Sequence, residues 1–450
     1  MANTTVNKVI LGNETLLDLT GDTITAADLA QGVTAHDASG AAIVGTYDKS
    51  SGSVYQDADG YLVVDDSESS APQGNLSITV NGTYDVADYA GASVDIPVGM
   101  TKTELKSFIS RDSSVTDIDW PEGLTVIGPY AFAYCYYFNP ASLPSGVTSI
   151  GEYAFFNCSR LAWTSLPSGL KTIGSYAFRR CDKLALTSLP SSVTSINTAA
   201  FQQCSSLELT ALPSGITSLN SSVFFGCTSL VSMALSGVTV IGSNAFQDCT
   251  SLATVTLSSG LTKVDAYSFS GCTALNVSAL PDSLTYIGNS AFNNCISITS
   301  ISCSGAVTTL GSSAFLGNSS HAMQLASASF PNMAIASNLT TAFGNNTAVY
   351  ACQLLEFCDI GSTTGIGSNA FANCYALETL VLRKSDSICT LANVNAFTNT
   401  PMSGYNNLTG TIYVPQALIS TYQTATNWST LYDAGTVTFA AIEGSEYERD

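Results

Sequence analysis

Charged residues and histidines are scarce in this 450-residue chain, and their scarcity limits the functions open to it. Only 11% of the residues are charged, and the two histidines, His36 and His321, lie far apart in sequence. Globular proteins carry about 25% charged residues, so serine, threonine, asparagine and glycine must supply the solvated surface here. Two distant histidines argue against a Ser-His-Asp or Cys-His catalytic arrangement. The sequence therefore predicts a protein that is not an enzyme and needs no cofactor.

Basic residues are scarcer than acidic ones, which limits the partners. The chain has 14 Lys and Arg against 34 Asp and Glu, a formal net charge of −20. Nucleic-acid phosphates and anionic membrane surfaces are both bound by clustered Lys and Arg. Long hydrophobic runs are also missing. The sequence contains no stretch of about 18 apolar residues, the length that a membrane-spanning helix needs. We therefore expect no nucleic-acid partner and no membrane insertion.

The first 20 residues lack the pattern of a secretory signal, which is a basic segment followed by an apolar one. A bacterial surface adhesin needs export, whereas a virion protein is made in the host cytoplasm and released by lysis. This absence favours a virion location, extracellular after lysis.

A tandem repeat occupies the middle and the end of the chain. Its clearest copies read GEYAFFNC, GSYAFRRC, GSNAFQDC and GNSAFNNC. A fixed period of about 20–50 residues indicates a stacked solenoid rather than a globule. The phenylalanines recur at steps of 23 residues with one step of 22, and three looser copies follow: Phe132, Phe155, Phe178, Phe201, Phe224, Phe246, Phe269, Phe292 and Phe315, then Phe343, Phe371 and Phe397.

Each repeat carries a sparse apolar ladder that a single copy cannot bury alone. Two short strands are expected in each coil, one around the leucine before the proline (ALTSLP, ELTALP) and one at the VTSI or LKTI segment. The Gly-Ser before Tyr-Ala-Phe predicts one short helical turn. The predicted fold is mainly β with short helical turns, a solenoid of about 12 coils preceded by small β modules.

The order L-P-x-x-[LVI]-x-x-I-G-x-x-A-F-x-x-C-x-x-L resembles the BspA-like leucine-rich repeat over about residues 111–403. The resemblance implies a curved solenoid that displays a recognition surface, as on cell-surface adhesins and on tail or fibre proteins of phages. It implies no catalytic residues. The sequence departs from the pattern where Asn318, Asn346 and Thr400 replace the cysteine and where Cys303 replaces a leucine.

The 13 cysteines do not have the spacing of a disulfide scaffold. Eight of them occupy one column of the repeat, where they predict a stacked row of small, buried, free thiols. Neighbouring coils bring such cysteines near bridging distance, so an occasional disulfide is the alternative. With two histidines and no Cys-x-x-Cys pair, no metal site is expected. The column is Cys135, Cys158, Cys181, Cys204, Cys227, Cys249, Cys272 and Cys295.

Composition and turn signals divide the chain into five parts. Residues 1–48 form a small module, and residues 49–72, rich in Ser, Asp and Gly, form a linker. Residues 73–100 form a small module with an Asn-Gly hairpin turn. Residues 101–403 form the solenoid, and residues 404–450 form a C-terminal cap whose acidic end is expected to fray.

The two N-terminal modules resemble parts of phage tail and fibre proteins of low-GC Gram-positive hosts. Neither is long enough to bury a large core alone, so docking onto other virion proteins or self-association is expected. Trimers are common among the fibres that the chain resembles, and the resemblance therefore implies a homotrimer.

Two columns of the repeat bring aromatic and basic residues onto neighbouring coils. Aromatic faces with polar neighbours suit sugar rings or an anionic polymer, and enrichment in aromatic residues and arginine is typical of recognition surfaces. In the alternative, the tyrosines stack for stability and the cations offset the acidity of the chain. The candidate receptor-binding residues are Tyr130, Tyr137, Tyr153, Arg160, Trp163, Tyr176, Arg179, Arg180 and Lys183.

These features together favour a phage fibre or receptor-binding protein whose solenoid meets a glycan or protein of the host surface. Two alternatives stay open. One is a structural decoration or a neck or tail appendage without a dedicated receptor, and the other is a bacterial adhesin of the BspA type.

Overall fold

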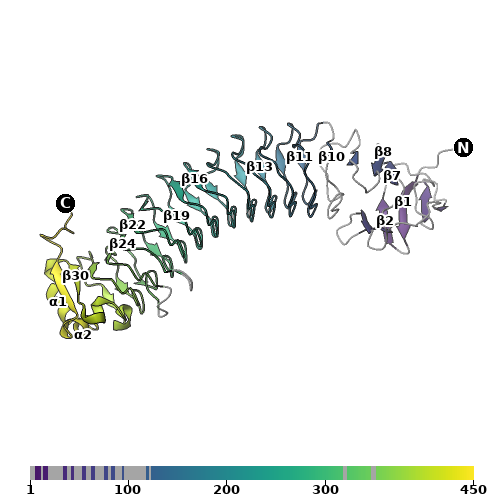
Figure 1. The fold of residues 1–450 in the computed structure, drawn as a ribbon. Coiled ribbons are helices and arrows are strands. Elements are labelled where there is room, and N and C mark those ends of the chain that lie inside the picture. The colour runs from purple at the N-terminus through teal and green to yellow at the C-terminus, as the bar shows by residue number, and fades with distance from the viewer. Residues whose placement is uncertain are drawn as a thin grey trace. The chain divides into compact units, whose positions relative to one another are not determined.

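The computed structural model describes residues 118–120, 123–317, 322–345 and 351–449, together with nine strands ahead of them. The chain divides into two compact units, Met1–Leu184 and Ala185–Asp450, which are described separately (Figure 1). The fold is mainly β with few helices, a parallel solenoid of the leucine-rich-repeat type. The fold class predicted from the repeat is confirmed.

Short antiparallel pairs make up the described chain before residue 96. β1 pairs with β2 and β3, β3 with β4, β5 with β6, and β7 with β8. The segment 49–72, expected to be a linker, therefore contains a hairpin. The bounds are β1 (Val6–Leu11), β2 (Glu14–Asp18), β3 (Thr34–Asp37), β4 (Ala42–Val44), β5 (Ser53–Gln56), β6 (Leu62–Asp65), β7 (Leu76–Thr79), β8 (Thr83–Val86) and β9 (Val94–Asp95), which pairs in parallel with β10 (Ile118–Asp119).

Each coil of unit 1 contributes one two-residue strand to a parallel ladder. β11 (Val126–Ile127), β12 (Ser149–Ile150) and β13 (Thr172–Ile173) pair in register, so the three isoleucines lie above one another. Each isoleucine is buried, and the residue before it is only partly covered. This alternation is the period of two expected for strands with one buried face. The predicted VTSI and LKTI strands are confirmed.

Unit 2 contains the same ladder. Its strands again pair in parallel and in register within two sheets, β15-β17-β19-β21-β23 and β25-β27-β29. The bounds are β14 (Ser195–Ile196), β15 (Ser218–Leu219), β17 (Val240–Ile241), β19 (Lys263–Val264), β21 (Tyr286–Ile287), β23 (Thr309–Leu310), β25 (Asn338–Leu339), β27 (Gly365–Ile366) and β29 (Thr390–Leu391).

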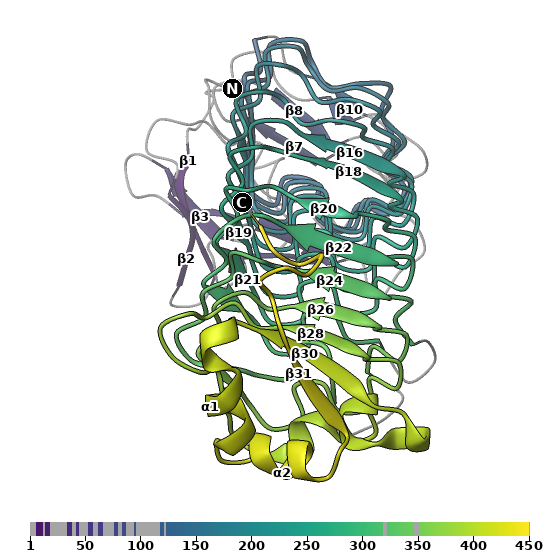
Figure 2. The ribbon, with the colours of Figure 1, turned by 90° about the vertical axis from the view of Figure 1, so that its left-hand side faces the viewer.

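A second parallel ladder of unit 2 uses longer strands. β16 pairs with β18, and a seven-stranded sheet follows in the order β20-β22-β24-β26-β28-β30-β31 (Figure 2). The bounds are β16 (Ser232–Leu235), β18 (Thr254–Leu257), β20 (Ala279–Leu280), β22 (Ser300–Cys303), β24 (Ser327–Ser329), β26 (Phe357–Asp359), β28 (Thr379–Val381), β30 (Gly410–Val414) and β31 (Val437–Ala441).

The sequence predicts this second strand in every coil, which is wrong for the described coils before β16. ALTSLP forms no strand, and ELTALP keeps only an isolated bridge between Ala211 and Ala234. Both segments end in proline, Pro190 and Pro213, which has no N–H to donate to a ladder. SMALSG and TVTLSS, which lack proline, form β16 and β18.

The predicted helical turn before the phenylalanine forms at Phe397, where η3 (Val394–Phe397) is a 3-10 helix, but not in the earlier described coils. Tyr153 has φ 53°, a left-handed conformation that no helical turn contains. The backbone N–H groups here donate alternately within the coil and to the next coil. Phe156 N donates to Tyr153 O at 3.1 Å, whereas Phe155 N donates to Ala177 O at 2.8 Å. The segment is thus a chain of tight turns that also links one coil to the next.

A column of stacked phenylalanine rings fills the core of each unit. In unit 1, Phe155 lies 5.3 Å from both Phe132 and Phe178 between ring centroids. In unit 2 the stack runs from Phe201 to Phe397 with nearly parallel rings. Offset-stacked aromatic pairs contribute about 0.5–1.5 kcal/mol beyond the burial of their surface. The repeated phenylalanine therefore stabilises every coil against its neighbour.

Six thiols of the cysteine column each donate a hydrogen bond to the phenylalanine carbonyl of the preceding coil: Cys158, Cys181, Cys227, Cys249, Cys272 and Cys295. Cys181 Sγ lies 3.0 Å from Phe155 O, and Cys272 Sγ lies 3.0 Å from Phe246 O. All 13 cysteines are free and buried, which confirms the predicted row of free thiols. Burial raises the pKa well above its ordinary value for Cys158, Cys181, Cys227, Cys249 and Cys272.

Helices close the C-terminal end of unit 2. Tyr422 and Trp428 are fully buried, and the Trp428 ring lies 5.9 Å from Phe397, the last ring of the stack. The helices after β30 are η6 and α1, which follow one another directly, and then α2. The bounds are η3 (Val394–Phe397), η4 (Pro401–Ser403), η5 (Tyr405–Asn407), η6 (Gln416–Leu418), α1 (Ile419–Thr424) and α2 (Trp428–Asp433).

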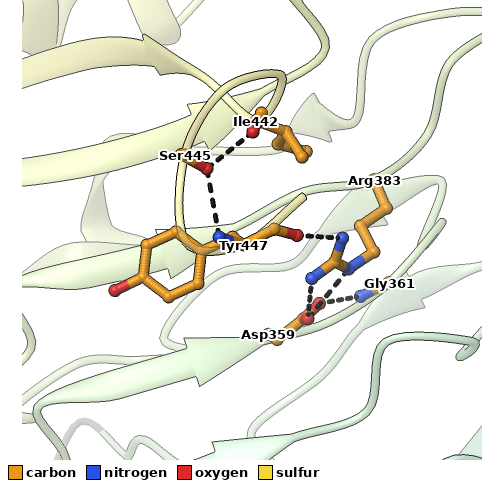
Figure 3. Close-up of polar contacts among 6 residues, drawn as sticks. All are labelled: Asp359, Gly361, Arg383, Ile442, Ser445 and Tyr447. Carbon is orange, nitrogen blue, oxygen red and sulfur yellow. Dashed lines mark hydrogen bonds and ion pairs between the residues drawn. The ribbon is translucent and has the colours of Figure 1, made fainter. Parts of the chain in front are cut away.

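The acidic C-terminal segment, expected to fray, folds back onto the second ladder (Figure 3). Asp359 is 1% exposed and pairs with Arg383, whose Nη2 lies 2.8 Å from Asp359 Oδ2. Arg383 Nη1 donates to Tyr447 O at 2.9 Å. The Tyr447 ring packs against Phe357 and Tyr413 at centroid distances of 5.4 and 4.6 Å. One buried ion pair therefore anchors the segment.

Raising the pH above about 9 is expected to destabilise the protein. The folded-state pKa of the buried thiols is raised, so their stabilising contribution is complete below the unfolded pKa of about 8.5 and is lost as the pH rises towards the folded value. Each thiol that ionises only in the unfolded chain lowers the free energy of unfolding by about 1.4 kcal/mol per pH unit. The urea concentration at the midpoint of unfolding, measured at about pH 7 and about pH 9.5, reports this loss of stability.

The control is Cys249→Ala with Cys272→Ala, which removes two of these thiols and should make the midpoint depend less on pH. Equal midpoints at the two pH values in the unaltered chain would contradict the expectation.

Replacing Arg383 by methionine is expected to destabilise unit 2 by about 3–5 kcal/mol, because the Asp359 carboxylate is left buried without its partner. Thermal unfolding of the Arg383→Met variant measures the loss. The added change Asp359→Asn should restore much of it, since no buried charge then remains. The interpretation fails if the single variant is as stable as the unaltered chain.

Candidate functional site

Three tyrosines of the predicted patch form a stack on neighbouring coils of unit 1. The rings of Tyr130 and Tyr153 lie 4.8 Å apart with an interplanar angle of 11°, and those of Tyr153 and Tyr176 lie 4.7 Å apart at 10°. Tyr130 is 46% exposed, and the other two are half-buried. These residues precede the phenylalanine by two positions, so the coil period brings them together as predicted.

Further aromatic rings extend this stack across the surface. Tyr153 meets Phe156 edge to face at 5.4 Å, and Phe156 meets Tyr134 in the same way at 5.0 Å. Tyr134 in turn contacts Tyr136 at 6.4 Å. A continuous set of ring contacts therefore joins three coils.

Two arginines lie over these rings. The guanidinium carbon of Arg160 is 4.5 Å from the centroid of Tyr137, and that of Arg179 is 5.6 Å from Phe156 and 5.8 Å from Tyr176. Cations over aromatic faces contribute about 0.5–1 kcal/mol at exposed sites. We call this set the aromatic–arginine surface: Tyr130, Tyr134, Tyr136, Tyr137, Tyr153, Phe156, Arg160, Tyr176 and Arg179, with Arg180 and Lys183 exposed on the same coil as Arg179.

The charge of this part of the chain is opposite to that of the rest. Residues 123–184 hold five basic residues and two acidic ones, whereas residues 185–450 hold four basic and 13 acidic ones. The two acids are Glu152 and Asp182, and burial raises the pKa of Asp182 despite its neighbours Arg180 and Lys183. The aromatic–arginine surface therefore lies on a locally cationic segment of an acidic protein.

The tyrosine stack presents ring edges rather than ring faces. At centroid distances below 5 Å, the faces of Tyr153 are covered by Tyr130 and Tyr176. Burial, followed by the neighbouring Tyr176 and Tyr130, raises the pKa of Tyr153. Its hydroxyl group therefore stays protonated at neutral pH and can donate a hydrogen bond.

Trp163, which the sequence groups with the patch, does not lie on the surface. It is 3% exposed, packs edge to face on Phe155 at 5.1 Å, and its Nε1 donates to Pro140 O at 2.7 Å. The columns of the repeat did not predict that three further rings belong to this surface: Tyr134, Tyr136 and Phe156. The only signal for them is the clustering of aromatic residues in AYCYYF and AFFNC.

Other kinds of site are not apparent in the described part of the chain. Within that part, no group of three or more His, Cys, Asp or Glu residues could hold a metal ion. A search of the same residues for a helix that is long and apolar enough to cross a membrane finds none.

Replacing Trp163 by phenylalanine is expected to lower the free energy of unfolding by about 1–2 kcal/mol, because the hydrogen bond to Pro140 O is lost and the smaller ring leaves space. Chemical denaturation measures the loss. Binding at the aromatic–arginine surface should be unchanged, and a large loss of binding without a loss of stability would contradict the buried position.

Comparisons with known proteins agree with the solenoid fold. The family model described as the BspA type leucine rich repeat region, in six copies, matches residues 101–231, 232–349 and 326–417, more than two thirds of the chain. No curated protein matches the chain. A solved leucine-rich repeat protein from Bacteroides ovatus is 24% identical with a TM-score of 0.52, over 75% of this chain and 86% of that chain.

Two further solved structures are similar over other portions. A leucine-rich repeat protein from T. pallidum is 30% identical over 35% of this chain and 72% of its own, with a TM-score of 0.31. A leucine rich cell surface protein from Faecalibacterium prausnitzii is 21% identical over 82% of this chain and 97% of its own, with a TM-score of 0.38. Because the family model covers most of the solenoid, this chain belongs to the BspA-type leucine-rich repeat family.

Proposed function

We propose that this protein is a non-catalytic recognition protein that binds a glycan of a cell surface through the aromatic–arginine surface. The observation that carries the proposal is the continuous contact of tyrosines and arginines, some exposed and some half-buried, across three coils. Tyrosine and arginine dominate the energetic centres of binding surfaces because they combine apolar area with hydrogen-bond donors. A stack that served stability alone would not require the cations.

The coils hold this surface in place before a ligand arrives. Tyr153 N donates to Ser175 O at 2.9 Å, and Asn157 N donates to Arg179 O at 2.7 Å. The backbone on both sides of the exposed rings is thereby tied to the next coil. A preorganised surface loses little conformational entropy when it binds, which favours affinity.

For the carrier of this surface we propose a phage virion, with the N-terminal modules docked onto other virion proteins and three chains in the fibre. The resemblance of residues 1–48 and 73–100 to phage tail and fibre modules supports this role. Membership of the BspA-type family favours a second candidate, a bacterial surface adhesin. A decoration protein without a receptor would need no aromatic–arginine surface.

Binding of the full chain to a glycan array tests the proposed function. We expect saturable binding that weakens at least tenfold, or by about 1.4 kcal/mol, in the double variant Tyr153→Ala and Arg179→Ala. Both side chains belong to the proposed binding surface. The matched control is Tyr375→Ala, which removes one ring of the stacked pair Tyr375–Tyr405 in unit 2. Absence of binding to every glycan, or equal loss in the control, would contradict the proposal.

Immunogold labelling separates the carriers. Labelled particles in a lysate of infected bacteria would support the virion, and labelled cell walls without particles would support the adhesin.

A further inference from the structure

We infer that the ligand is an anionic glycopolymer, held by its carboxylate or phosphate groups, rather than a neutral sugar chain stacked on tyrosine rings. This inference rests on the proposed function and names the chemistry of its ligand. It follows from what the aromatic–arginine surface leaves available to a partner.

Several of the ring faces that a neutral sugar would use are already occupied. Tyr153 is covered on both faces by Tyr130 and Tyr176. One face of Tyr137 is covered by Arg160 at 4.5 Å, and Tyr176 has Arg179 over it at 5.8 Å. Stacking on a sugar requires an open aromatic face, so these rings offer mainly their edges and hydroxyl groups.

The groups that remain available are hydrogen-bond donors and cations. The stack gives a row of phenol hydroxyl groups that repeats at the spacing of the coils. Arginine binds carboxylate and phosphate through two parallel N–H groups, and a lysine adds a point charge. Donors of this kind complement oxyanions.

Local charge favours the same class of ligand. Residues 123–184 carry five basic and two acidic residues in a chain with a net charge of −20. The acidity of the other parts limits how much polyanion can approach, since unscreened repulsion acts within a Debye length of about 8 Å at physiological salt. Nucleic acid is disfavoured further, because base stacking needs the ring faces that are covered here. A short anionic segment of a surface polymer fits these constraints best.

The full chain should be titrated by calorimetry with four probes: a polyuronate, a glycerol-phosphate polymer, neutral dextran and single-stranded DNA. We expect binding of the polyuronate or the glycerol-phosphate polymer, weakened at least tenfold by a rise from low to high salt. The preferred probe identifies carboxylate or phosphate as the recognised group. Arg160→Gln with Arg179→Gln should abolish this binding, and Tyr153→Phe, which keeps the stack but removes a hydroxyl group, should weaken it severalfold.

Two matched controls lie in unit 2. Lys263→Gln removes a cation that lies 4.9 Å over the Tyr286 ring, and Tyr375→Phe removes a hydroxyl from a stacked tyrosine pair. Both should bind like the unaltered chain. Tighter binding of neutral dextran, insensitive to salt but lost in the arginine variant, would overturn this inference and leave the proposed function intact. Binding of none of the three glycans would overturn the inference, and binding of DNA as tight as that of the best glycan would overturn it as well.

Discussion

The structure depends on the register in which one coil lies on the next. Two recurring interactions set this register: the phenylalanine rings stack, and six thiols of the cysteine column each donate to the phenylalanine carbonyl of the coil before. Both are buried, and a slip by one residue would break them together. Because the same contacts recur, stability is a sum of similar steps, each between neighbours only. This explains why the chain can be long and poor in charge without one large globular core.

The register also accounts for the aromatic–arginine surface. Tyr130, Tyr153 and Tyr176 hold equivalent positions in their coils, and each has a φ between 53 and 58°. A left-handed backbone costs roughly 1–2 kcal/mol for a residue other than glycine. At equivalent positions unit 2 carries small residues, such as Ala199 and Ser222, and one exposed tyrosine, Tyr267, all with the same conformation. Large rings are therefore not required by the turn itself, which is compatible with the proposal that the three stacked tyrosines serve binding.

Much of the fold could be predicted from the sequence, because a periodic core leaves a periodic pattern. The spacing of the phenylalanines predicted the solenoid, and the column of cysteines predicted the free thiols. The left-handed turns could not be predicted, since Tyr153 and Ser175 carry no sign of which backbone partner their N–H and C=O groups take. Proline alone did not predict where the second ladder strand fails, since Pro190 follows a segment without a strand but Pro281 directly follows β20. The columns predicted most of the surface, but Trp163 shows the limit: spacing identifies which residues are neighbours and leaves open which side of the coil each one faces.

Removal of one whole coil tests this account most directly. Deletion of residues 247–269 joins Phe246 to Ser270, and deletion of residues 156–178 joins Phe155 to Arg179, so each removes one 23-residue period. The account predicts that both shortened proteins keep the circular dichroism spectrum of the full chain and unfold cooperatively, and that only the second loses glycan binding. Collapse of both proteins to unfolded chains, or equal loss of binding in the two, would contradict it.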